Sequence, residues 1–144
     1  MVDQTRETAL QEAIELLYFS YRAFTDRADR ILEQRGLNRV HHRILYFVGR
    51  NPDVNVNTLL GILDVSKQAL NGPLRQLIEM DLIAMRAAPQ DGRVRQLRLT
   101  YAGERLEARL SGTQRKQLAE VFDAAGPAAE SGWRAVMQRL AANR

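Results

Sequence analysis

The sequence predicts a mostly α-helical fold with one small β-hairpin, and three observations support this fold class. Aromatic residues form 6% and hydrophobic residues 45% of the 144 residues, which favours helices packed with Leu, Ile, Val and Ala over a β-sandwich. Two short helical segments meet at a three-residue turn, 64–66. Two strand-like segments then enclose a run of turn-forming residues at 89–92.

A long first helix is expected over 8–34, with Gly36 ending it. Its apolar residues recur at alternating steps of four and three, which is a heptad-like stripe. Further apolar residues lie outside the stripe, so the helix has more apolar surface than one packing face requires. This excess favours a helix that also packs against a second subunit, with an ordinary long core helix as the alternative. The stripe consists of Leu10, Ile14, Leu17, Tyr21, Phe24, Ala28 and Ile31.

The next segments predict a helix-turn-helix. Asn38 is suited to cap a helix over 39–48, and Asn57 is suited to cap a short helix over 58–63. After the turn, Ser66 caps the following helix by accepting a backbone N–H bond. Two short helices joined by such a turn form a helix-turn-helix. Core-facing positions are expected at Val40, Ile44, Leu45, Val48, Leu59, Leu60 and Leu63.

The helix that begins at Ser66 has two different sides. Gln68, Asn71 and Arg75 share one side, because they are three and seven residues apart. Amides suit the major-groove edge of adenine and Arg suits that of guanine, while Lys67 at the helix N-terminus suits phosphate. Any exposed helix face is polar, so the pattern gains its meaning from its place between a turn and a basic hairpin. Leu70, Leu74 and Leu77 lie on the opposite side.

Gly72-Pro73 interrupts this helix. Pro73 lacks the N–H that would bond to the carbonyl of Ala69, which costs roughly 3 kcal/mol in a helix interior. Two outcomes are open: a kinked continuous helix, or a short turn followed by a new helix that begins near Pro73. The common inward register of the three leucines favours the kink. Our hypothesis is that the pair sets the angle at which the helix reads DNA; the alternative is a kink without functional consequence.

Strands are predicted over 83–87 and 94–100, and a hairpin in this position is a wing. Arg93 lies at its tip beside Asp91, which is able to orient the guanidinium. An arginine held in this way suits a DNA minor groove, with a weak surface ion pair as the alternative. Thr100 is then suited to cap a helix running towards Phe122, and a last helix is expected over about 128–142, with Trp133 as a packing residue.

Composition narrows the function. The chain has 21 Lys and Arg against 17 Asp and Glu, a net charge of +4 that favours an anionic partner. Cysteine is absent, which suits a reducing, cytoplasmic location and excludes thiol chemistry. Neither a phosphate loop nor a nucleophile elbow is present, so no enzyme activity, catalytic residue or cofactor is predicted. His41 and His42 are adjacent and diverge by about 100° on a helix, so no metal site is expected.

The long first helix is followed by VNTLLGILDVSKQALNGPLRQLIEMDLI, by a hairpin around QDGRVRQLRLT, by YAGERLEARL and by a closing helix. This order of elements resembles the MarR family of winged helix-turn-helix transcriptional regulators. The most specific parts are the DVSK turn with LRQLIEMDLI, and a D-x-R wing leading into R-L-T-x-x-G. The resemblance implies one domain, 1–144, with dimerisation helices at 8–36 and 101–144 around a DNA-binding lobe at 38–100.

The resemblance implies a homodimer that binds a pseudo-palindromic operator in double-stranded DNA, as a repressor released by a small aromatic or phenolic effector. The recognition helix would enter the major groove and the wing the minor groove. A winged-helix interaction or dimerisation module that has lost DNA binding is the alternative. Asp81 departs from the family, where a glycine is common, but Asp tolerates a left-handed conformation. The implied DNA-binding residues are Ser66, Lys67, Gln68, Asn71, Arg75, Asp91, Arg93 and Arg95, and the effector candidates are Phe19, Phe24, His42 and Tyr46.

Overall fold

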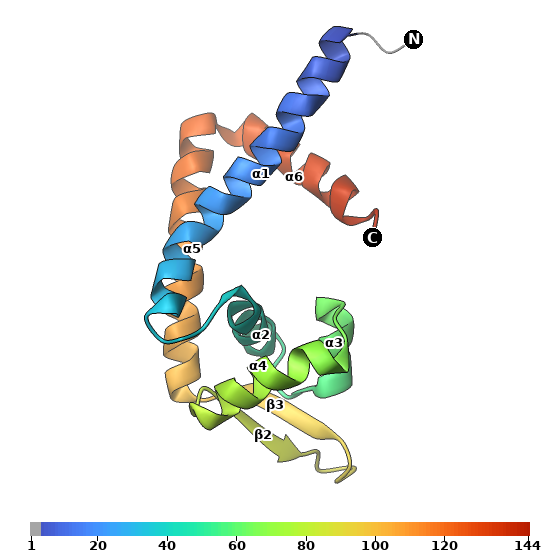
Figure 1. The fold of residues 1–144 in the computed structure, drawn as a ribbon, viewed down its shortest axis with the longest axis vertical. Helices are drawn as coiled ribbons and strands as arrows, with labels where there is room; N and C mark the ends of the chain where they lie inside the picture. Colours follow the sequence, from blue (N-terminus) through green and yellow to red (C-terminus); the bar gives the residue numbers. More distant parts are fainter. Residues whose placement is uncertain (1–3) are drawn as a thin grey trace.

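The computed structural model describes residues 4–144, which form six helices and three strands. Figure 1 shows a lower lobe of short helices and a sheet, from which two long helices, α1 and α5, rise side by side. The helices are α1 (Gln4–Glu33), α2 (Arg39–Arg50), α3 (Val56–Leu63), α4 (Lys67–Glu79), α5 (Tyr101–Ala125) and α6 (Pro127–Ala141). The strands are β1 (Val54–Asn55), β2 (Ile83–Ala87) and β3 (Arg95–Leu99). The predicted mostly α fold with a hairpin wing is confirmed.

The sheet is antiparallel, with strand order β1-β3-β2. Leu97 in the central strand pairs with Met85 on one side and with Val54 on the other. The sequence did not reveal β1, because a strand of two residues is too short to display an alternating pattern. The sheet therefore ties the wing hairpin to the loop that follows α2.

The N-cap of α3 was predicted wrongly. Asn55, not Asn57, caps this helix, and its side chain accepts a hydrogen bond from the Thr58 N–H at 2.7 Å. Both asparagines are good caps in sequence terms. Pairing of Asn55 with Gln96 in the sheet holds its backbone extended, as an N-cap requires, and so starts the helix two residues earlier than predicted.

The inward face of α2 also differs from the prediction. Val40 is 37% exposed, whereas His41 and His42 are buried. The side chain of His41 closes a capping box by accepting from the Asn38 N–H, so a polar residue occupies the buried position of the first turn. Ile44, Leu45 and Val48 face the core as predicted.

The helix α4 is continuous, with Pro73 inside it. The alternative of a turn followed by a second helix is therefore wrong. Ser66 caps the helix as predicted, and its hydroxyl accepts from the Ala69 N–H at 3.1 Å. Asp81 after the helix has φ 59°, the left-handed conformation expected of it. The three inward leucines, Leu70, Leu74 and Leu77, are all buried.

The upper helices leave much apolar surface uncovered. Residues 4–23 of α1 are all exposed, and α6 buries none of its residues. Trp133 packs its ring 5.1 Å from that of Phe122 but remains 41% exposed. None of the helices in 4–144 combines the length and the apolarity that crossing a bilayer requires. Exposed large apolar residues on these two helices include Leu10, Ile14, Leu17, Phe19, Tyr21, Val136 and Leu140.

Candidate nucleic-acid interface

The outer face of α4 presents free polar groups. Gln68, Asn71 and Arg75 are exposed on one side of the helix, and Lys67 is exposed at its N-terminus. Within residues 4–144 the side chains of these four form no hydrogen bond or ion pair with the rest of the chain. Their donors and acceptors are thus available to an external partner, while the buried leucines on the opposite side fix the helix to the lobe.

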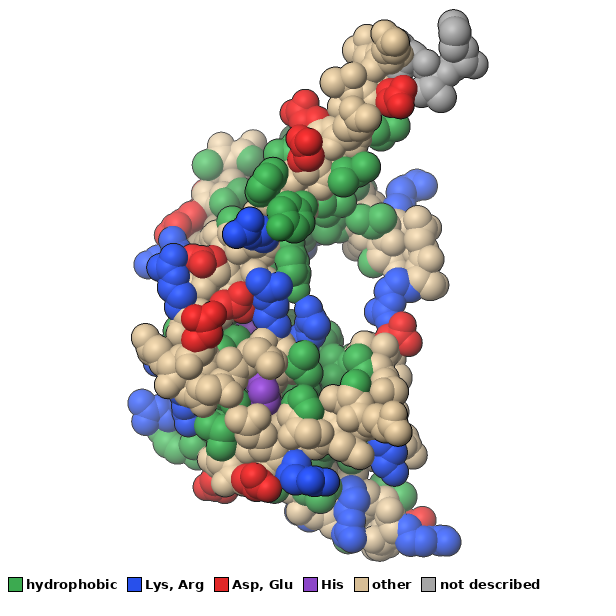
Figure 2. Space-filling model, in the orientation of Figure 1, with side chains coloured by type: hydrophobic (Ala, Val, Ile, Leu, Met, Phe, Trp, Pro, Cys, Tyr) green, Lys and Arg blue, Asp and Glu red, His purple; other side chains and the backbone are tan. Residues whose placement is uncertain are grey.

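The wing carries a second group of exposed cations. The side chain of Arg93 is 93% exposed at the hairpin tip. Asp91 accepts from the Arg93 backbone N–H at 3.0 Å and from its Nε at 3.4 Å, which is the contact that the sequence predicted. Arg95 begins β3 and is also exposed. Figure 2 shows basic side chains gathered at the protruding lower end of the molecule, where the wing lies in Figure 1.

The base of the wing holds an ionic cluster that sequence reasoning missed. Asp53 binds Arg98 through two hydrogen bonds, of 2.6 and 3.2 Å, and contacts Arg86 at 3.4 Å. The hydrogen bond from Arg98 holds the pKa of the Asp53 carboxyl below its usual range. Pairing within the sheet brings these residues together, and the pattern of the sequence could not reveal it because β1 itself was not recognised.

A partly buried hydrogen-bond network anchors the inner side of α4. The Asn38 N–H donates to His41 Nδ1 at 3.0 Å, so the ring proton lies on Nε2 and donates to Gln76 Oε1 at 2.9 Å. Gln76 Nε2 in turn donates to the Gly36 carbonyl at 3.3 Å. This network joins α4 to the corner between α1 and α2. Sequence reasoning missed it, since 35 residues separate His41 from Gln76.

A cavity of about 850 Å³ lies where α1, α2 and α5 meet. Three of the four effector candidates, Phe24, His42 and Tyr46, line it. The fourth, Phe19, does not reach it and is 59% exposed higher on α1. Tyr21 and Phe47 add further aromatic surface to the wall.

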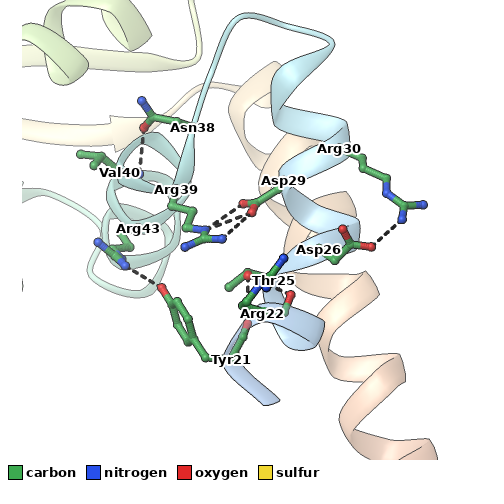
Figure 3. Close-up of polar contacts among 10 residues, drawn as sticks. All are labelled: Tyr21, Arg22, Thr25, Asp26, Asp29, Arg30, Asn38, Arg39, Val40 and Arg43. Carbon is green, nitrogen blue, oxygen red and sulfur yellow. Dashed lines mark hydrogen bonds and ion pairs between the residues drawn. The ribbon is translucent and has the colours of Figure 1, made fainter. Parts of the chain in front are cut away.

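The cavity wall has an excess of positive charge. Arg39 pairs with Asp29 at 2.9 Å, whereas Arg43 donates only to the uncharged Tyr21 hydroxyl, at 2.8 Å. Figure 3 shows both arginines reaching from α2 towards α1. Arg115 lines the cavity without an ion pair to any residue of 4–144. Aromatic walls with uncompensated arginines suit an aromatic anion.

His42 lies on the polar side of this cavity. Ser111 donates its hydroxyl proton to Glu107 at 2.8 Å, so its oxygen accepts from His42 Nε2 at 3.2 Å. Burial lowers the pKa of His42, against an opposing effect of the Glu107 charge. In the described part of the chain no group of three His, Asp or Glu residues is arranged to hold a metal ion.

Comparisons with known proteins agree with this geometry. A family model described as MarR family matches residues 35–94. The HTH-type transcriptional regulator PetP of Rhodobacter capsulatus is 43% identical over 131 residues, which cover 91% of this chain and 79% of that protein. The MarR family transcription regulator SP03579 superposes with a TM-score of 0.78 at 22% identity, over 95% of this chain and 91% of that one. An S. aureus MepR–DNA complex superposes with a TM-score of 0.71 at 17% identity, over 90% and 96% of the two chains.

Proposed function

This chain belongs to the MarR family of winged helix-turn-helix transcriptional regulators, and from that membership we propose that it binds double-stranded DNA sequence-specifically. The observation that carries the proposal is the exposed face of α4, whose polar groups are unpartnered, together with the exposed arginine of the wing. The DNA in the superposed MepR complex supports it. The recognition helix α4 enters the major groove and the wing enters the adjoining minor groove.

Each residue of the interface has a proposed role that follows from its chemistry. Gln68 and Asn71 read bases through their amides, and Arg75 reads guanine. Arg93 enters the minor groove, attracted by its negative potential. The remaining proposed roles are the cap of α4 for Ser66, phosphate contacts for Lys67 and Arg95, and orientation of the wing arginine for Asp91.

The active species is a homodimer in this proposal. The exposed apolar residues of α1 and the unburied face of α6 are too extensive for a free surface, so segments 8–36 and 101–144 act as dimerisation helices. A twofold dimer presents two recognition helices to a pseudo-palindromic operator with half-sites about 10 bp apart. Segment 38–100 is the DNA-binding lobe.

The cavity supports the further proposal that the protein is a repressor that responds to a ligand. It lies between the dimerisation helices and the DNA-binding lobe, and its wall suits a small aromatic or phenolic anion. Arg98 lines the cavity and also binds Asp53 at the base of the wing. A ligand that draws Arg98 towards the cavity would therefore act directly on the wing, and so on operator binding.

Binding of mixed-sequence duplex DNA at several salt concentrations tests the function. A DNA-binding protein releases counterions, so log K falls linearly with log salt, with a slope of about −0.9 for each phosphate contacted. Sedimentation equilibrium in the same buffer should give twice the chain mass of 16.4 kDa. A dimer that shows negligible affinity at low salt would instead support the alternative, a winged-helix interaction or dimerisation module without DNA binding.

A further inference from the structure

Asp53 occupies an unusual position at the edge of the sheet. It immediately precedes β1, has φ 65°, and its backbone N–H donates to the Leu97 carbonyl at 3.0 Å. Its carboxylate is exposed enough to be solvated, yet it binds two arginines. Aspartate tolerates the left-handed region better than most residues do, and at this position the backbone bond to Leu97 and the two arginines hold it in place.

The two arginines come from different strands. Val54 pairs with Leu97, so Asp53 lies opposite Arg98 in the central strand β3. Arg86 belongs to the outer strand β2, opposite Gln96, and it crosses β3 to reach the same carboxylate. One side chain thus joins all three strands on a single face of the sheet. Since β1 pairs through only two residues, this ionic bridge is a further connection between β1 and the hairpin.

The bridge also divides the cations of the wing into two kinds. Arg86 and Arg98 are both paired with Asp53, whereas Arg95 has no partner among residues 4–144 and Arg93 has only the weak contact to Asp91. The arginines at the base therefore hold the hairpin, and those near the tip remain free for an anion. This division separates a tethering role from a DNA-contacting role within one hairpin.

We propose that Asp53 is a positioning residue for DNA recognition: by binding Arg86 and Arg98 it fixes the base of the wing, so that Arg93 meets the minor groove while α4 occupies the major groove. The inference rests on the proposed DNA-binding function. Asp53 itself, an anion, does not contact DNA and acts entirely through the arginines. Its removal costs operator specificity even though it adds net positive charge.

The test compares Asp53→Asn with Asp81→Asn. Asp53 is partly exposed and Asp81 is exposed, both have φ values near +60°, and asparagine tolerates this conformation as aspartate does. Asp81 forms no ion pair with any part of 4–144, so its variant controls for the change in net charge and for the backbone. The probe is a duplex selected by the parent chain from a random-sequence pool, and affinity is measured by fluorescence anisotropy against that duplex and a scrambled one.

Asp53→Asn should weaken operator binding by about tenfold, a typical coupling between contacting residues, while affinity for the scrambled duplex stays level or rises. Asp81→Asn should not weaken operator binding. In an Arg93→Ala background, Asp53→Asn should produce no further loss, because Asp53 acts through the wing. Equal losses with and without Arg93, or operator affinity unchanged by Asp53→Asn, would overturn the inference.

A measurement without DNA separates this inference from the proposed function. Amide hydrogen exchange over residues 83–99 of the free protein should accelerate several-fold in Asp53→Asn and remain at the parent rate in Asp81→Asn. If the amide exchange rate in Asp53→Asn equals that of the parent, Asp53 does not fix the base of the wing, and the inference is overturned even where the parent binds its operator. If the parent chain binds no DNA, the proposed function fails, and the proposed role of Asp53 in recognition is overturned with it, whatever the exchange data show about the sheet.

Discussion

Gly103 lies so close to the carbonyl of Leu82 that no Cβ fits between them. Two hydrogen bonds strengthen the same contact, since the Thr100 N–H donates to the Leu82 carbonyl at 3.1 Å and the Thr100 hydroxyl donates to the Asp81 carbonyl at 2.6 Å. The first turn of α5 is thereby fixed to the segment that follows α4. The helix α5 and the segment after α4 are joined at this point, where the R-L-T-x-x-G pattern of the sequence lies.

Gly103→Ala should destabilise the fold by about 1–3 kcal/mol, because the new methyl group collides with a backbone carbonyl that cannot rotate away. Gly112→Ala in the same helix is the matched control. Its Cβ would meet only the Arg115 side chain at 3.7 Å, so it should stabilise by about 0.5–1 kcal/mol through helix propensity. Urea denaturation of both variants measures the difference, and opposite signs are the expected result.

The two parts of the interface should respond differently to truncation. Gln68→Ala or Asn71→Ala should relax base preference at particular operator positions, with a loss of about 1–3 kcal/mol for the preferred base. Arg93→Ala should weaken binding more broadly across operator variants. Competition binding with a set of single-base operator variants measures both effects. Equal loss on every variant for the two amide truncations would show that these residues are not base readers.

Acidification should destabilise the protein through His42. Burial lowers its pKa in the folded state, so the unfolded chain binds more protons once the pH falls below about 6.5. The stability that neutral His42 provides is therefore complete above that pH and declines as the pH falls through the lower, folded-state pKa. Thermal unfolding between pH 7.5 and pH 5 measures this decline; these two pH values are roughly one unit or more on either side of the ordinary value.

His42→Gln is the control for this pH dependence. A glutamine can still donate to the Ser111 hydroxyl but does not titrate, so the fall in melting temperature should be smaller in the variant. His41 is retained in both proteins and cancels in the comparison. Identical pH profiles for parent and variant would assign the acid sensitivity to other groups.

Pro73→Ala should stabilise the protein by up to about 3 kcal/mol, since α4 is continuous and proline omits a helical hydrogen bond there. Chemical denaturation measures the gain, and selection of duplexes from a random pool measures base preference. A changed preference supports the hypothesis that Gly72-Pro73 sets the reading angle of the helix. An unchanged preference at higher stability means that the proline has no role in recognition.

Local signals in the sequence were sufficient for most elements of the fold. Ser66 and Thr100 cap their helices as predicted, and the strand 83–87 has the predicted bounds. The errors at Asn57 and Val40 have a common cause. In each case a contact outside the local pattern decided: pairing of Asn55 with β3 moved the start of α3, and the capping box of His41 turned that residue inward in place of Val40.

The sequence by itself determined the order of elements, the polar stripe on α4 and the Asp91–Arg93 pair, because caps, periodicity and turn residues act over a few positions. Only the tertiary structure decided that α4 continues through Pro73, that Phe24 but not Phe19 reaches the cavity, and that Asp53 bridges Arg86 and Arg98. These relationships depend on packing and strand pairing between residues far apart in the sequence, such as Asp53 and Arg98, which are 45 positions apart. Such contacts form only when the chain has folded, and no local pattern encodes them.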